Sequence, residues 1–124
     1  MRKPTITTLR RKLDKVFSEY IRGRDAPSGK GRCITCNQFT ELECGHFIPR
    51  QHAVLRWDER NAHGQCSRCN RWLHGDQAEY YIQLVKRYGQ EVVDELMTLK
   101  HTTKKHTKAD LEELIDRYSP KDAI

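Results

Sequence analysis

Apolar side chains recur at helical spacing near the start of the chain, over residues 5–22. They return every three or four positions, as expected for a helix that buries one face against a core. Basic residues fill much of the remaining surface of this segment. The apolar positions are Leu9, Leu13, Val16, Phe17, Tyr20 and Ile21. We therefore predict a basic, amphipathic helix over 5–22.

Helical spacing returns after Cys66 and predicts three further helices before residue 100. The first is short and ends before Gly75, and the second ends at Gly89, because glycine is common just after a helix. The apolar positions of the second and third helices are Tyr80, Tyr81, Leu84, Val85 and Tyr88, then Val92, Val93, Leu96, Met97 and Leu99. We expect these helices to share a core, with Tyr80 and Tyr81 inside it.

A basic, polar stretch at 100–108 precedes the last predicted helix. Thr107 begins this helix, and Asp110 three residues later completes a capping-box pattern. Pro120 ends it. Its apolar positions are Leu111, Leu114, Ile115 and Tyr118.

The middle of the chain lacks long periodic patterns. Residues 24–32 are rich in Pro, Gly and Ser and predict a loop. Residues 33–47 are too short and interrupted for a long helix, so we expect a metal-binding knuckle and a short hairpin. Residues 48–65 resemble a loop. At 124 residues the chain has the size of one domain.

Charge and composition favour an anionic partner. The chain is 36% hydrophobic and 32% charged, and its formal net charge is +6. Nucleic acid is favoured over a membrane surface because the basic helices also carry acids and no lipidation motif is present. No apolar run approaches 18 residues, and no apolar stretch follows the N-terminal charges. We therefore expect a cytoplasmic protein that does not contact the membrane.

Four of the five cysteines form two Cys-x-x-Cys pairs, Cys33 with Cys36 and Cys66 with Cys69. Two such pairs can complete a tetrahedron of thiolates around Zn²⁺, and a closed site of this kind is structural. Unliganded thiols or a redox pair are the alternatives. We interpret Cys44 as a small core residue or a neighbour of an active site.

Four polar residues lie between and just after these cysteine pairs: His46, Asn61, Asn70 and His74. Phosphodiester hydrolysis needs a base to activate water and a cation to neutralise developing charge. A histidine, a polar residue that orients it and an Asn/His pair four apart on a helix supply those parts. Each residue alone is more often structural, but their joint order favours catalysis.

The order C-x2-C, GH, N and C-x2-C-N with a following His resembles the zinc-bearing HNH nucleases of the ββα-metal superfamily. The strings LDKVFSEYIRGRDA, GRCITC, CGHFIPRQ, LRWDERNAHGQCSRCN and GDQAEYY resemble the phage recombination proteins NinG or Rap, over roughly residues 9–90. The resemblance implies an α+β fold with a small ββα-metal core. We expect a single domain over 1–124, with a basic helix at 1–24, the zinc and HNH core at 29–76 and helices at 77–124.

The resemblance also implies roles for the polar residues. His46 would be the general base and Asn61 would orient its imidazole, while Asn70 and His74 would hold a catalytic Mg²⁺ or Mn²⁺. Most HNH enzymes have a metal ligand immediately before the base, where this chain has glycine. Glu43 would substitute if that glycine formed a bulge, or water would fill the site. His63 is the rival base.

Cations in the loop after the predicted base and on the basic first helix are candidates for DNA contacts, although the loop could instead be merely solubilising. They are Arg50, Arg56 and Arg60 in the loop, with Arg10, Arg11 and Lys15 on the first helix. Guanidinium groups there would pair with phosphate oxygens. Trp57 either borders the phosphate or fills the core, and we expect Trp72 to pack inside.

These expectations define a metal-dependent DNA endonuclease encoded by a phage or prophage and acting in the host cytoplasm. The resemblance implies branched recombination intermediates, such as Holliday junctions, as substrates. A two-fold dimer would supply two active sites, and helices 5–22 and 107–118 are its candidate surfaces unless they simply cover the core. The alternative is a non-catalytic, zinc-stabilised DNA-binding protein. A zinc module for protein contacts is disfavoured by the excess of Lys and Arg.

Overall fold

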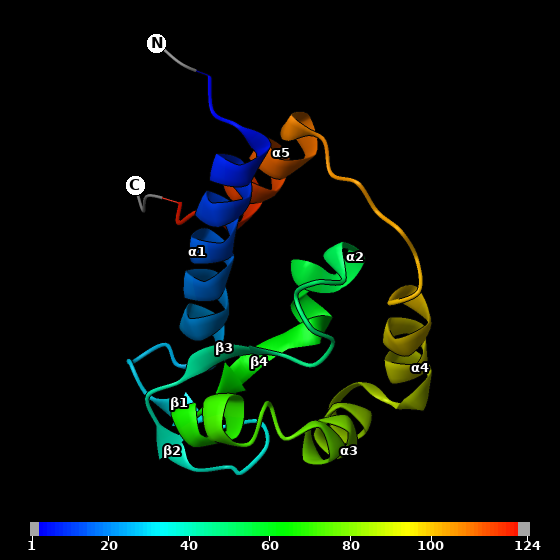
Figure 1. Cartoon of the computed structure of the whole chain (residues 1–124). Helices are drawn as coiled ribbons and strands as arrows, with labels where there is room; N and C mark the ends of the chain where they lie inside the picture. Colours follow the sequence, from blue (N-terminus) through cyan, green and yellow to red (C-terminus); the bar gives the residue numbers. More distant parts are fainter. Residues whose placement is uncertain (1–2, 122–124) are drawn as a thin grey trace.

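The computed structural model describes residues 3–121, which fold into helices around small antiparallel strand pairs (Figure 1). The predicted α+β class is confirmed, and residues 1–2 and 122–124 of the predicted ranges lie outside the described residues. No helix within 3–121 has the length and apolar character needed to cross a membrane. The elements are α1 (Ile6–Asp25), β1 (Gly31–Arg32), β2 (Phe39–Thr40), β3 (Glu43–His46), α2 (Ala53–Arg56), η1 (Glu59–Asn61), β4 (Ala62–Gln65), η2 (Arg68–Trp72), α3 (Gln77–Tyr88), α4 (Gln90–Leu99) and α5 (Lys108–Tyr118).

Helix α1 confirms the predicted first helix and extends it by three residues, to Asp25. The extension is held by contacts with β4, where Arg24 donates to the carbonyl of Ala62 and Asp25 accepts from the amide of Gly64. Both hydrogen bonds are 2.8 Å long. Helical periodicity carries no sign of such long-range contacts, so the predicted loop over 24–32 wrongly included Arg24 and Asp25.

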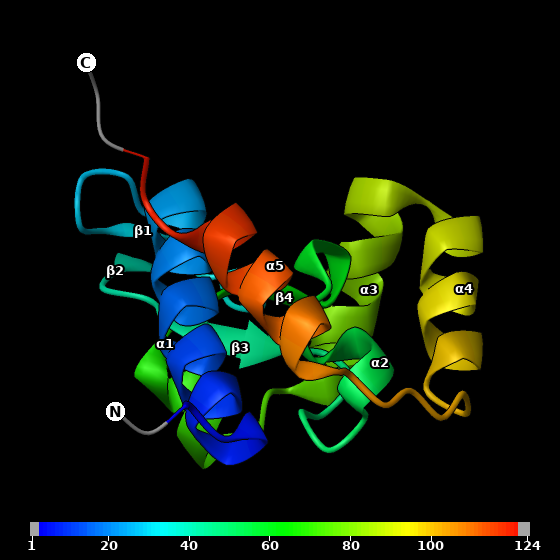
Figure 2. The same cartoon turned by 90° about the horizontal axis from the view of Figure 1, so that it is seen from above.

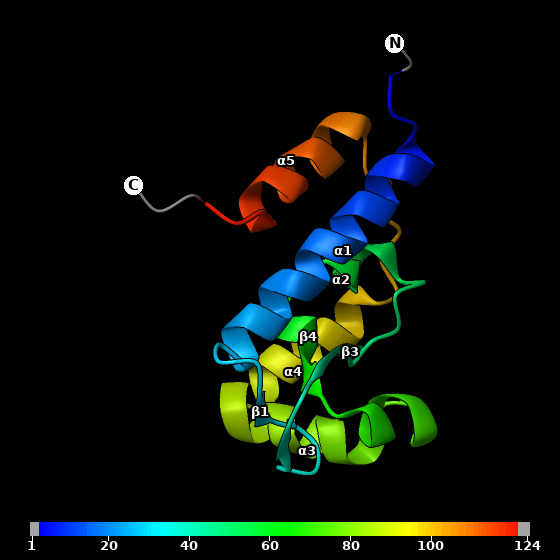
Figure 3. The ribbon, with the colours of Figure 1, turned by 90° about the vertical axis from the view of Figure 1, so that its left-hand side faces the viewer.

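Helix α5 packs beside α1, and together they contribute most of the first core (Figure 3). The predicted capping box is present, with the Thr107 and Asp110 side chains each accepting from the other residue's backbone amide. The buried members of this core are Leu9, Leu13, Phe17, Ile21, Trp57, Ala62, Leu111, Ile115 and Tyr118. Both helices therefore use their apolar stripes within the chain to cover the core, and the dimer remains a prediction.

Strands β3 and β4 form an antiparallel hairpin with a long connection, and this pairing corrects the sequence prediction. Residues 62–65 were expected to be loop, yet they are a fully buried strand. Its sequence, AHGQ, has no β-branched or aromatic residue, so local propensity gave no signal. The register pairs Gly45 with His63 and His46 with Ala62 without an extra residue. The bulge proposed at Gly45 is absent.

The β3–β4 hairpin lies between two layers of helix (Figures 1 and 2). Side chains alternate across a strand, so Cys44 and His46 share the face that packs on α1. Gly45 and His63 occupy the opposite face, where the Tyr80 hydroxyl from α3 donates to the Gly45 carbonyl at 2.7 Å. The second core on that side joins Ile34, Phe47, Ile48, Leu55, Tyr80, Leu84, Val93 and Leu96.

Candidate metal centre and candidate active site

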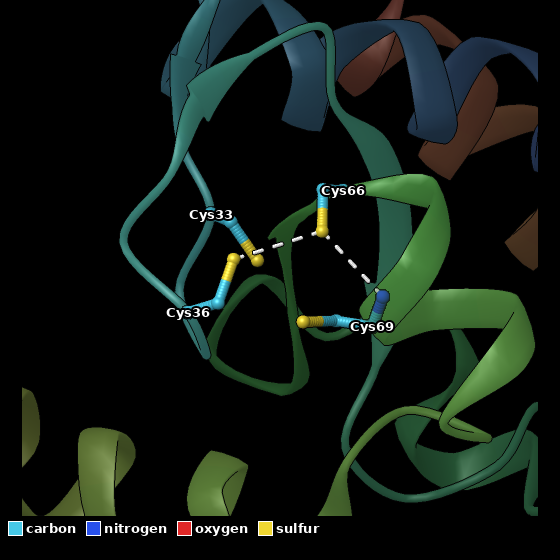
Figure 4. Close-up of side chains that lie close together, drawn as sticks. All are labelled: Cys33, Cys36, Cys66 and Cys69. Carbon is cyan, nitrogen blue, oxygen red and sulfur yellow. Dashed lines mark hydrogen bonds between the residues drawn. The ribbon is translucent and has the colours of Figure 1, made fainter.

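The four cysteines of the two Cys-x-x-Cys pairs come together in space. Cys33 and Cys36 lie in the turn between β1 and β2, while Cys66 and Cys69 follow β4. Their sulfur atoms all lie within 4.8 Å of one another and point into one space (Figure 4). The Cys36 and Cys66 sulfurs are 3.7 Å apart. A tetrahedral Zn²⁺ with Zn–S bonds of about 2.3 Å requires sulfurs about 3.8 Å apart, so the cluster fits a metal such as zinc.

The surroundings of the cluster favour a thiolate at Cys33. Burial acts to raise the pKa of that thiol, but hydrogen bonds from the Thr35 hydroxyl and from backbone amides outweigh burial and lower the pKa to about 6. Burial raises the pKa of Cys69 to about 12. A bound cation would stabilise the thiolate form of every member, because metal coordination deprotonates thiols.

A pocket of about 450 Å³ lies beside the hairpin, on the face that packs against α1. Three parts of the chain meet there: helix α1, the end of β3 with the loop after it, and the segment that follows Cys69. The lining residues are Asp14, Phe17, Ser18, Cys44, His46, Pro49, Arg50, Asn70, His74, Gly75 and Gln77. The predicted base and the predicted metal-binding pair thus border one pocket.

His46 ends β3 and lines this pocket with its imidazole half-buried. Its Nε2 lies 2.8 Å from the backbone carbonyl of Arg56. A carbonyl accepts hydrogen bonds only, so Nε2 carries the hydrogen and Nδ1 of the neutral ring keeps a free lone pair. Burial, assisted by the nearby positive charge of Arg50, lowers the pKa of His46. The ring is therefore neutral at pH 7.

The hydrogen bonds of the Asn61 side chain go to the backbone of Ile48 and Leu55 and not to the His46 imidazole, which corrects its predicted orienting role. Its side chain is completely buried and bonds to both backbone groups of Ile48, at 2.8 and 2.9 Å. The same amide donates to the carbonyl of Leu55 at 3.1 Å. Asn61 thus closes the loop between β3 and β4. The imidazole is oriented instead by the carbonyl of Arg56, which lies in that loop.

Asp14 is a site residue that the sequence analysis missed. It lines the pocket from α1 and accepts a two-pronged ion pair from Arg56. The indole of Trp57 donates to the same carboxylate at 3.0 Å, so Trp57 belongs to the core and not to a phosphate contact. The signal was available, since Asp14 is the single acid within the basic run from Arg10 to Phe17.

Asn70 and His74 both reach the pocket, although not through the predicted helical spacing. Element η2 is a π-type turn that ends at Trp72, and His74 has a positive φ of 51°. The Asn70 amide donates to the Glu43 carboxylate at 2.9 Å. Asn70 is therefore held by a neighbour on β3.

Glu43 lies beside the pocket but is not among its lining residues. Its carboxylate pairs with the Arg71 guanidinium at 2.8 Å, in addition to accepting from the Asn70 amide.

Close packing, and not a bulge, explains why residue 45 is a glycine. A Cβ on Gly45 would lie 2.0 Å from the side-chain oxygen of Gln65, so only glycine leaves room for that side chain.

His63, the rival base, lies on the opposite face of the hairpin and is completely buried. Its Nδ1 lies 3.2 Å from the Tyr80 hydroxyl and its Nε2 lies 2.7 Å from the Tyr88 hydroxyl. Burial lowers the pKa of His63 to about 3. With both ring nitrogens in hydrogen bonds, His63 has no lone pair to offer a substrate.

The predicted DNA-contacting cations divide into two groups. Arg56 and Arg60 form ion pairs within the chain, Arg56 with Asp14 and Arg60 with both Asp58 and Glu95. The side chain of Arg50 is 61% exposed, borders the pocket and lies 3.7 Å from Asp14. The predicted contacts on α1 are all exposed: Arg10, Arg11 and Lys15. Among these predicted contacts, the accessible cations therefore lie on α1 and at the pocket.

Fold and site together define a small α+β protein in which a cluster of four cysteines, able to hold a metal, lies in the segment next to a histidine-containing polar pocket. The chain belongs to the NinG family: the family model described as "Bacteriophage Lambda NinG protein" matches residues 3–122. It is similar to "Protein ninG" of Escherichia phage 933W, with 36% identity over 89 residues that cover 69% of this chain and 43% of that protein. The corresponding protein of Escherichia phage lambda is 35% identical, with 69% of this chain and 42% of the relative covered. That of Enterobacteria phage H19B is 40% identical over the same share of this chain and 43% of its own length.

The matched region thus spans less than half the length of these curated relatives. No solved structure matches the chain.

Proposed function

We propose that this protein is a metal-dependent DNA endonuclease of the HNH type, built on a structural zinc site. The observation that carries the proposal is the environment of His46. Its Nε2 is engaged by the Arg56 carbonyl, which leaves Nδ1 with a lone pair, and the residue lines a pocket together with Asn70 and His74. A neutral histidine with one nitrogen oriented and the other free is what a general base requires.

Zinc in the four-cysteine cluster would have a structural role. Four thiolates leave no open coordination position, so the ion would not activate water. It would join the turn between β1 and β2 to the segment after β4, which also carries Asn70 and His74. Folding of the pocket would therefore depend on metal, because coordination supplies folding free energy directly.

The chain's own residues suggest how hydrolysis would proceed. Nδ1 of His46 would take a proton from water as the oxygen attacks phosphorus, and the resulting imidazolium would be held by the Arg56 carbonyl. The bond from phosphorus to the 3′-oxygen would break in the same displacement, and the departing 3′-oxygen would take up a proton from solvent. Arg50, exposed at the pocket edge, would pair with a phosphate oxygen and hold the strand. The ion pair between Asp14 and Arg56 would keep the loop carrying that carbonyl in place.

Asn70 and His74 would hold a catalytic Mg²⁺ or Mn²⁺. The Asn70 amide donates to Glu43, which leaves the oxygen of Asn70 free as a ligand, and His74 is exposed at the same pocket. We assign Glu43 the role of orienting Asn70, in place of a ligand. Ions of this kind prefer oxygen, keep several waters and, when bound, neutralise charge on the phosphate.

The family resemblance favours branched recombination intermediates, such as Holliday junctions, as substrates in the cytoplasm of a bacterial host. A homodimer would supply two sites for symmetric cuts. The spread of positive charge over α1 and the pocket suits backbone contacts, which report DNA shape and not sequence.

The testing experiment compares cleavage of a four-way junction, a flap and a linear duplex by the zinc-loaded protein with Mg²⁺, Mn²⁺ or EDTA. The proposal expects cleavage that requires the added metal, is fastest on branched DNA and is lost in His46→Ala. Failure to cut any of these substrates in either metal would overturn it.

The second candidate is a non-catalytic, zinc-stabilised DNA-binding protein. One observation favours it: within residues 3–121, the four cysteines are the single cluster of three or more His, Cys, Asp or Glu side chains able to hold a metal. This candidate expects DNA binding in the same assay, without cleavage and without dependence on Mg²⁺ or Mn²⁺.

A further inference from the structure

The side chain of Trp72 is 79% exposed, the largest exposed fraction of any large apolar side chain within residues 3–121. The sequence analysis expected it to pack inside, and that prediction is wrong. A tryptophan can bury 150–250 Å² and accounts for much of the energy at many interfaces, so one held in solvent needs an explanation. Leu73 beside it is 41% exposed.

The backbone around Trp72 is fixed even though its side chain is exposed. The amide of Leu73 donates to the carbonyl of Arg68 at 2.9 Å, and the amide of Gly75 donates to the carbonyl of Cys69 at 2.8 Å. Cys69, three residues before Trp72, is buried in the four-cysteine cluster. Trp72 therefore projects from a turn anchored by the metal ligands.

The turn that carries Trp72 also carries two cations and leads into the candidate active site. Arg68 and Arg71, from the same turn, are both exposed. The turn also carries Asn70 into the pocket of His46, and His74 follows it. An exposed aromatic ring next to guanidinium groups is the combination that binds unpaired bases, because bases stack on aromatic faces while cations pair with the backbone.

We propose that Trp72 stacks on an unpaired base at a DNA branch point and so places the adjacent phosphodiester at the pocket. This inference rests on the proposed nuclease function and names the structural feature of the substrate that the site would recognise. Fully paired duplex offers no exposed base face, so Trp72 would add nothing to duplex binding. Arg68 would hold the neighbouring phosphates of the unpaired strand.

The test measures competition binding at fixed salt in a His46→Ala background, which removes cutting. The probes are a duplex with a single-stranded flap and a fully paired duplex of the same sequence. Trp72→Ala should weaken flap binding by between about 5- and 150-fold, the range for losing one base–aromatic stack. Duplex binding should change by less than about twofold, and Trp72→Phe should retain most of the flap affinity. Ile82→Ala is the matched control, because Ile82 is an exposed apolar residue on α3.

Fluorescence gives an independent readout without substitution in the turn. Trp57 is only 5% exposed, so acrylamide should quench mainly Trp72. Flap DNA should shield this fluorescence, and paired duplex should not. If Trp72→Ala weakens binding to the flap and to the paired duplex equally, or weakens neither, the inference is overturned. It is also overturned if the substitution changes the oligomeric state and leaves DNA affinity unchanged. Failure of wild-type cleavage would contradict the nuclease alone, since selective flap binding is measured without cutting.

Discussion

Two histidines on one β-hairpin have opposite surroundings. His46 faces α1 and an open pocket, and within residues 3–121 only one of its two ring nitrogens has a hydrogen-bond partner. His63 faces α3, is completely buried and has both nitrogens bonded to tyrosine hydroxyls. The two residues lie on adjacent strands, one register position apart. Available lone pairs, and not residue type or proximity, distinguish a candidate base from a structural residue.

The largest expected effect concerns the four-cysteine site, because the hairpin that carries both histidines is expected to depend on it for folding. Cys33→Ser should prevent folding of the hairpin region, because zinc coordination in small domains contributes roughly 10–16 kcal/mol of apparent binding free energy. Circular dichroism and elemental analysis of purified protein measure this. Cys44→Ser is the matched control, since Cys44 lies outside the metal cluster. A folded, metal-free Cys33→Ser protein would contradict a structural metal.

The next effect concerns His63 alone. His63→Phe replaces the imidazole by a larger ring without polar atoms and removes one hydrogen-bond partner from each of two tyrosine hydroxyls, which should cost about 1–3 kcal/mol in the free energy of unfolding. Urea titration measures this loss. Replacing Tyr88 by Phe in the same protein should recover part of it, because removing both partners leaves fewer buried groups unsatisfied. Unchanged stability in the single variant would remove the structural role assigned to His63.

The next prediction concerns the pocket of His46 and the dependence of cleavage on added Mg²⁺ or Mn²⁺. Asn70→Ala and His74→Ala should each shift the Mg²⁺ or Mn²⁺ concentration for half-maximal cleavage upward by about ten- to a hundredfold, while zinc content stays constant. Glu43→Gln should give a smaller shift, because Glu43 orients Asn70 through its carboxylate. Loss of zinc from the Asn70 or His74 variant would place that residue in the structural site.

The smallest effect comes from Asp14, which acts on His46 through Arg56. Asp14→Asn should slow cleavage by several-fold, because the loop that carries the Arg56 carbonyl loses its ion pair. The negative charge of Asp14 raises the pKa of His46, so its removal should move the acidic limb of the rate–pH profile to lower pH. Asp116→Asn, on the exposed face of α5, is the control. An unmoved limb would exclude Asp14 as a positioning residue.

The sequence was sufficient for the long helices α1, α3, α4 and α5 and for the grouping of four cysteines, but not for α2 or the turn η2. Leu9, Leu13 and Phe17 repeat at helical spacing, and the paired Cys-x-x-Cys motifs predicted that four sulfur atoms would come together. It failed at β4, where Gln65 and His63 are buried by partners far along the chain. For the same reason Asn61 was assigned to an imidazole and not to the loop that it closes. Polar residues buried by tertiary hydrogen bonds leave no periodic pattern.

The most direct test measures single-turnover cleavage of a labelled branched DNA by the wild-type, His46→Ala and His63→Phe proteins, each zinc-loaded and folded, over a range of pH. Because the pKa of His46 is lowered from 6.5, the wild-type rate should persist down to that pH and fall only below it, as the base becomes protonated. His46→Ala should lose on the order of 10²–10⁴ in rate, whereas folded His63→Phe should cut at nearly the wild-type rate. Cleavage by His46→Ala at the wild-type rate, or its abolition in folded His63→Phe, would contradict the account.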